Sequence, residues 1–152
     1  GKTATLDDLA DGATFAIPND TSNEARALQL LAAQGLITLK DGVGLEATPN
    51  DIVENPKNLQ FEEIEAAQVP NVLADVDFGI VNGNYALSAG IADTALVKES
   101  AESEAATTYA NVLAIREGDD RPELKALEEA LNSQEVKDYI NETYHGTVIA
   151  VF

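Results

Sequence analysis

The chain of 152 residues alternates short apolar runs with longer amphipathic stretches. Apolar residues at helical spacing predict a helix from Asn23 to Gln34, one that begins near Pro122, and one between Ser133 and Gly146. The apolar runs are rich in residues that favour β-structure and predict six strands, at residues 14–17, 36–39, 59–61, 77–81, 109–115 and 147–152.

Strands separated by helices favour parallel pairing, because a parallel connection must cross over the sheet. We therefore expect an α/β fold, with a mostly parallel sheet flanked by helices on both faces. The sequence contains no internal repeat, low-complexity tract or long linker. Its length suits one domain, so we predict a single α/β domain over residues 1–152.

Charge and composition exclude several classes of function. Nine Lys and Arg residues against 27 Asp and Glu residues give a net charge of −18, which repels nucleic acids and anionic membrane surfaces. The chain has no Cys and a single His, His145, which we interpret as a cap on the last helical turn. We therefore predict no metal site, no cofactor and no catalytic residue, so the protein is not expected to be an enzyme.

The first candidate site follows the strand predicted at residues 14–17, because ligands of parallel α/β sheets bind at the carboxyl ends of strands. This loop contains Asn19 and leads into a helix, where Thr21 and Glu24 match a capping box. Free amides of the first helical turn together with Arg26 suit an anion such as a carboxylate. The alternative is that Arg26 is a surface residue paired with an acid.

The second candidate site is the loop at residues 80–86, which follows another predicted strand and precedes a short predicted helix. Asn82 and Asn84 each offer two donors and an acceptor, which suits binding both charged groups of an amino acid. The alternative is a plain turn, because Asn-Gly is a common turn dipeptide.

An acidic stretch lies between residues 58 and 97, which contain no Lys or Arg. Paired carboxylates can act as acid and base, but no neighbouring group is evident that would separate their pKa values. We therefore interpret this stretch as a solvated acidic face, formed by Glu62, Glu63, Glu65, Asp75, Asp77 and Asp93.

Several sequence strings together resemble the NlpA lipoprotein family, which includes the methionine-binding receptors of bacterial ABC importers. The resemblance continues in order along nearly the whole chain. Its strings are residues 16–20, 23–28, 35–37, 39–45, 51–59, 65–70, 75–77, 81–86 and 133–137.

The resemblance implies a binding protein of two lobes, each like a lobe of a type 2 periplasmic binding protein, that close on a small amino acid and deliver it to a membrane permease. By this resemblance Arg26 pairs with the ligand carboxylate and Asn82 binds the ligand, with Asn23 as a further candidate. The complete receptor is expected to be extracytoplasmic and anchored by a lipid. The chain has no long apolar run, so we expect it to be soluble and without an anchor of its own.

The resemblance covers the second lobe of such receptors, at about residues 1–105, and a C-terminal segment, at about residues 106–152, that crosses back to the other lobe in the family. Without a first lobe, that segment needs another partner surface, so we expect a homodimer formed through it. An alternative function is a non-catalytic scaffold or domain-swapped interaction module that does not bind the ligand.

Overall fold

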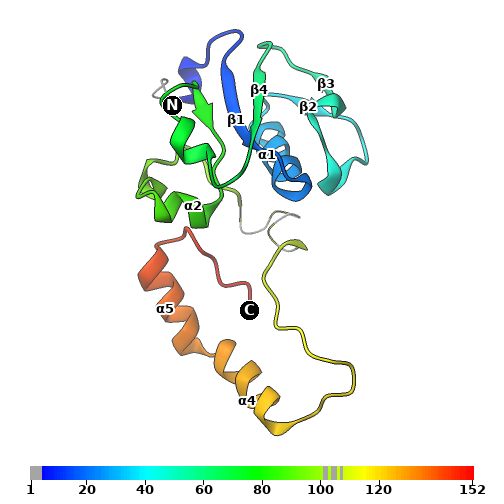
Figure 1. Cartoon of the computed structure of the whole chain (residues 1–152), viewed down its shortest axis with the longest axis vertical. Coiled ribbons are helices and arrows are strands. Elements are labelled where there is room, and N and C mark those ends of the chain that lie inside the picture. Colours follow the sequence, from blue (N-terminus) through cyan, green and yellow to red (C-terminus); the bar gives the residue numbers. More distant parts are fainter. Residues whose placement is uncertain (1–4, 101–102, 104–105, 107) are drawn as a thin grey trace. The chain divides into compact units, whose positions relative to one another are not determined.

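The computed structural model describes residues 5–100, 103, 106 and 108–152 (Figure 1). Contacts divide the chain into two units, residues 1–98 and 99–152. The boundary lies near the division expected at about residue 105, and the interpretation as a single domain stays a prediction. No helix among the described residues combines the length and the apolar character needed to cross a bilayer.

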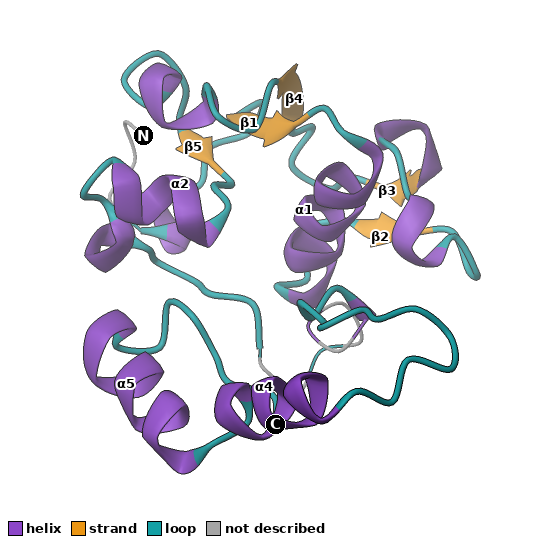
Figure 2. Ribbon diagram, turned by 60° about the horizontal axis from the view of Figure 1, so that its bottom comes forward, coloured by secondary structure: helices purple, strands orange, loops and turns teal. Residues whose placement is uncertain are grey.

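A three-stranded parallel sheet forms the centre of the first unit (Figure 2). Strand β1, Thr14–Pro18, lies between β4, Gln60–Ile64, and β5, Phe78–Gly79. Four of the five residues of β1 are buried, as expected for a central parallel strand covered on both faces. The strands predicted near residues 14, 59 and 77 are confirmed, and so is their parallel pairing.

Alternate side chains of β1 pack on opposite faces of the sheet. Phe15 and Ile17 point toward helix α1, Thr21–Ala33, where they share a core with Leu28. On the other face Ala16 packs against the 3₁₀ helix η4, Val69–Val72. Helical segments therefore cover both faces, which confirms the predicted α/β class.

A two-stranded antiparallel pair extends the first unit beside α1. It joins β2, Thr38–Leu39, to β3, Ile52–Glu54, through the 3₁₀ helices η2, Gly44–Glu46, and η3, Pro49–Asp51. The prediction of a strand at residues 36–39 is confirmed, but its expected place in the parallel sheet is wrong. Parallel pairing would need a long crossover helix between β2 and β3, and their connection contains only short 3₁₀ helices, so the two strands pair antiparallel.

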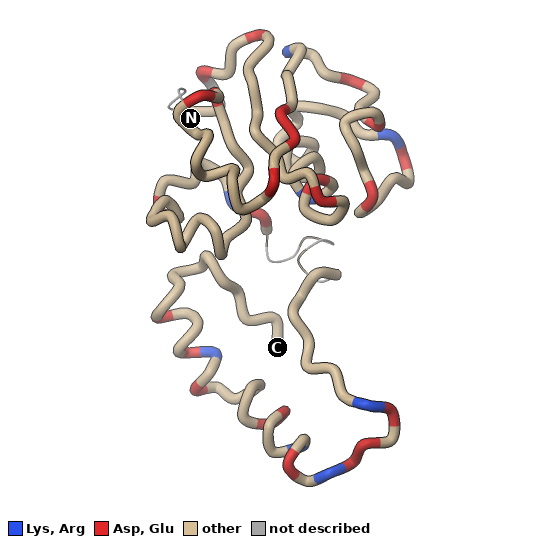
Figure 3. Tube along the Cα trace, viewed as in Figure 1, with Lys and Arg blue, Asp and Glu red and all other residues tan. Residues whose placement is uncertain are grey.

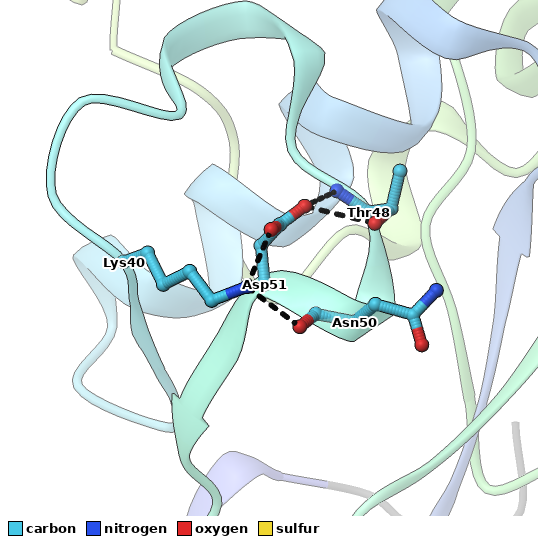
Figure 4. Close-up of polar contacts among 4 residues, drawn as sticks. All are labelled: Lys40, Thr48, Asn50 and Asp51. Atoms are coloured by element: carbon cyan, nitrogen blue, oxygen red, sulfur yellow. Dashed lines mark hydrogen bonds and ion pairs between the residues drawn. The ribbon is translucent and has the colours of Figure 1, made fainter.

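An ion pair and a capping box hold this antiparallel pair closed (Figure 4). Lys40 Nζ lies 3.0 Å from Asp51 Oδ1, and the Thr48 amide and hydroxyl donate to Asp51 Oδ2 at 3.0 and 2.8 Å. Lys40 also donates to the backbone carbonyl of Asn50. The pKa of Asp51 is lowered to about 2 by three hydrogen bonds. The bond from the Thr48 amide has the largest effect, and those from Lys40 and the Thr48 hydroxyl follow.

Short helical segments complete the first unit. They are η1, Leu6–Asp8, η5, Ala92–Thr94, and helix α2, Gly83–Ser88. The short helix predicted after residue 82 is confirmed by α2. Acidic residues outnumber basic ones along the traces of both units (Figure 3).

The second unit contains α4, Pro122–Leu131, and α5, Gln134–Tyr144, which confirm the two predicted C-terminal helices. Ser133 caps α5 by accepting from the Val136 amide, and His145 ends it in the left-handed conformation, as the predicted cap. The strands predicted at residues 109–115 and 147–152 are wrong, because both segments are irregular. A strand needs a neighbouring strand to satisfy its backbone, and the described part of this unit contains none.

Candidate functional site

The two predicted loops meet at the carboxyl ends of the parallel strands. The backbone amide of Asn19 donates to the carbonyl of Ile64 at 2.9 Å, which ties the first loop to the end of β4. The amide of Ile80 donates to the carbonyl of Ala16 at 2.9 Å, which ties the start of the second loop to β1. The sheet therefore brings together loops separated by about 60 residues in the sequence.

Asp20, rather than Thr21, caps helix α1. The side chain of Asp20 accepts from the backbone amide of Asn23 at 3.2 Å, and Thr21 is already the first helical residue. The capping box predicted for Thr21 and Glu24 is therefore wrong. A carboxylate is as good a cap as a hydroxyl and also interacts favourably with the positive end of the helix dipole.

Three of the predicted site residues form one hydrogen-bonded cluster. Asn82 Nδ2 donates to Asn23 Oδ1 at 2.8 Å, and Arg26 Nη1 approaches the same oxygen at 3.5 Å. Asn23 Nδ2 in turn donates to both carboxylate oxygens of Asp20 at 3.0 Å. We call these four residues, Asp20, Asn23, Arg26 and Asn82, the head-group cluster.

The amide oxygen of Asn82 is buried and accepts no hydrogen bond from the described residues. Asn82 precedes α2 as its N-cap residue, yet its side chain does not cap that helix. Asn82-Gly83 therefore leads into a helix, and the alternative of a plain turn is wrong. A buried acceptor without a donor is costly, so it favours a ligand that brings an N–H group.

Asn19 and Asn84 lie outside the head-group cluster. Both are exposed, and among the described contacts their hydrogen bonds use backbone atoms: the Asn19 amide binds Ile64, and the Asn84 carbonyl accepts from the Ser88 hydroxyl at 2.9 Å. Their side chains make no hydrogen bond to the cluster within the described part of the chain. Their roles in ligand binding stay predictions.

Glu24 is a buried ionisable residue beside the cluster, which the sequence analysis considered only as part of a capping box. Its side chain is 7% exposed. Burial, a hydrogen bond with the Glu63 carboxyl, and the charges of Glu63 and Asp20 raise the pKa of Glu24 to about 7. Glu63 is exposed, as expected for a solvated acidic face, but it has in Glu24 a neighbouring carboxyl with a raised pKa that the sequence analysis did not expect.

A signal for this burial was present in the sequence. Glu24 precedes Leu28 and Leu31 at helical spacings of four and seven residues, on the stripe that packs against the sheet. A charged residue on such a stripe indicates a buried carboxyl. The described residues contain no group of three His, Asp or Glu side chains placed to hold a metal ion.

Comparison with known proteins identifies relatives of this chain. A family model described as NlpA lipoprotein matches residues 1–152. The membrane lipoprotein TpN32 of Treponema pallidum (strain Nichols) is 41% identical over 146 residues, which cover 95% of this chain and 54% of TpN32. The chain spans about half the length of the curated relatives it matches.

Two solved structures share the fold at similar identity. A nutrient binding protein from Burkholderia cenocepacia, bound to methionine, is 42% identical with a TM-score of 0.81, over 99% of this chain and 64% of that one. A periplasmic substrate-binding protein of an ABC transporter from Coxiella burnetii is 42% identical with a TM-score of 0.85, over 99% of this chain and 63% of that one.

Proposed function

Because the chain belongs to the NlpA lipoprotein family, we propose that it is the substrate-binding part of an ABC importer and that its ligand is methionine. Two relatives support the proposal, one bound to methionine and one assigned to an ABC transporter. In this function the chain binds and releases its ligand without chemical change, so it needs neither a catalytic residue nor a cofactor.

The head-group cluster offers complementary groups for an amino acid. The Arg26 guanidinium pairs with the ligand carboxylate, which its planar geometry suits. The amide oxygen of Asn82 accepts from the ligand ammonium, and Asn23 lies between the two. Asn19 and Asn84 border the site. The observation that carries this proposal is the buried Asn82 oxygen without a donor among the described residues.

We further propose that the protein acts outside the cytoplasm. The relative TpN32 is a membrane lipoprotein, which supports a lipid anchor. The relative from an ABC transporter supports delivery of the ligand to a permease. The net charge of −18 disfavours a nucleic-acid partner.

The second unit supports an additional proposal, that this chain forms a homodimer through residues 106–152. Several large apolar side chains of this segment are exposed, and covering them would be favourable. The more exposed among them are Val112 at 82%, Tyr139 at 61%, Ile115 at 54% and Val151 at 52%.

Titration calorimetry of L-methionine into the chain tests the function. We expect saturable heat with a dissociation constant on the order of millimolar, because the head-group cluster binds only the charged groups of the ligand. Arg26→Ala should abolish the heat by removing the partner of the carboxylate. The matched control is Arg121→Ala, because Arg121 is paired with Asp119 in the second unit, at 2.8 and 2.9 Å.

Equal heats for the wild type and Arg26→Ala would contradict the proposed site, and no heat from the wild type would contradict ligand binding by this chain. The alternative function is a non-catalytic scaffold, which the exposed apolar surface of the second unit favours. A scaffold would melt at a temperature that depends on protein concentration and not on methionine.

A further inference from the structure

The orientation of the two amides in the head-group cluster is determined by their charged neighbours. A carboxylate only accepts hydrogen bonds and a guanidinium only donates them, whereas an amide has one end of each kind. Asn23 lies between Asp20 and Arg26. Its Nδ2 must therefore face Asp20, at 3.0 Å, and its Oδ1 must face Arg26, at 3.5 Å.

The orientation of Asn23 then determines that of Asn82. Because Asn23 presents an oxygen, Asn82 must present its Nδ2, and the two atoms lie 2.8 Å apart. The other end of the Asn82 amide is consequently an oxygen, which is the buried atom without a donor. If the Asn23 amide were reversed, Asn82 would turn its oxygen toward Asn23 and its NH₂ group toward the ligand, which suits a carboxylate.

We propose that Asp20, acting through Asn23, is a positioning residue that orients the Asn82 amide to accept from the ligand's ammonium group. Asp20 thereby selects ligands with a free amino group. This inference rests on the proposed function and adds the reason for one part of its specificity. Asp20 also caps α1, so the same carboxylate stabilises the start of the helix and determines how the amides of the cluster are oriented.

The test compares methionine with its des-amino analogue, 4-(methylsulfanyl)butanoic acid, by calorimetry. The wild type should prefer methionine by about 10- to 100-fold, since a buried hydrogen bond to a charged group is lost with the analogue. Asn23→Ala should reduce this preference to about threefold or less, because the Asn82 amide can then rotate. The control Asn50→Ala should retain the preference, because the Asn50 side chain is exposed and outside the cluster.

A variant in which residues 20 and 23 are exchanged tests whether the direction of the hydrogen bonds, rather than the identity of each residue, determines the preference. In Asp20→Asn combined with Asn23→Asp, the amide at position 20 donates to the carboxylate at position 23, which again accepts from Asn82. Asn is also a good helix cap, so the fold is retained. This double variant should restore a preference of at least about 10-fold. In an Asn82→Ala background, Asn23→Ala should change the preference no further, because Asn23 acts through Asn82.

A second measurement does not depend on the ligand. In ¹⁵N NMR of the free chain, one Nδ2 proton of Asn82 should exchange slowly with solvent in the wild type and the double variant, and rapidly in Asn23→Ala. Rapid exchange in the wild type would overturn the inference. Methionine binding with a preference that Asn23→Ala leaves unchanged would also overturn it, while the proposed function would stand. Slow exchange without methionine binding would support the amide orientation and reject the function.

Discussion

At the scale of single residues, the buried Glu24 carboxyl costs stability when it ionises. Its raised pKa means that the folded state holds the proton more tightly than the unfolded chain. The stabilising effect is complete below the ordinary value of 4.5 and is lost as the pH rises through about 7. Glu24 therefore links the stability of the first turn of α1 to pH.

Glu24→Gln removes this link while it keeps the side-chain volume. We expect the variant to be more stable than the wild type at pH 8, by on the order of 1 kcal/mol after solvent screening at the exposed Glu63. At pH 5 the two should differ little. Urea unfolding at both pH values measures the difference. The control is Glu65→Gln, an exposed neighbour; an identical pH response of both variants would contradict the role of Glu24.

At the scale of elements, the antiparallel pair of β2 and β3 depends on the carboxylate of Asp51. Its two partners come from different segments, Lys40 after β2 and Thr48 before η3. Because the strands themselves are only two and three residues long, their backbone pairing alone is weak. The polar contacts of Asp51 therefore hold the connection in place.

Asp51→Asn should lower the melting temperature at pH 7, because the ion pair with Lys40 and the charge-assisted bonds from Thr48 are lost. The pKa of Asp51 is lowered, so its stabilising effect is present above the ordinary 3.8 and is lost as the pH falls through about 2. The difference from the wild type should thus shrink toward pH 2. Calorimetric melts measure it, with exposed Asp41→Asn as the control; a difference independent of pH would contradict this account.

At the scale of the whole molecule, the two units differ in how they bury apolar side chains. The first has a core on both faces of its sheet, whereas the described helices and irregular segments of the second contain no fully buried residue. Such a unit gains stability when a partner surface covers it.

We expect the chain to form dimers in light scattering at high concentration. Val112→Asp together with Ile149→Asp, at side chains that are 82% and 44% exposed, should shift the population to monomers, because charge on the apolar segment opposes its burial. The control is Val53→Asp, an exposed valine of β3 in the first unit, at 54%. A wild type that stays monomeric at high concentration would contradict the homodimer.

The sequence by itself determined the elements whose pattern is local. The apolar run of β1, the helical spacing of α1 and the caps of α5 follow from neighbouring residues, and the carboxyl ends of the strands located both loops of the site. Arg26 and Asn82 were predicted from these loops, and Asn23 was added by the family resemblance; the structure brings the three side chains together.

Only the tertiary structure decided what depends on distant partners. Asn82 meets Asn23 across 59 residues, and Glu63 meets Glu24 only because β4 pairs with β1. The apolar runs at residues 109–115 and 147–152 form no strands, because backbone hydrogen bonds need a neighbouring strand that their composition cannot supply. The apolar side chains of a segment are favourably buried whatever the fold, but only the pairing of strands in the sheet determines which groups lie next to them.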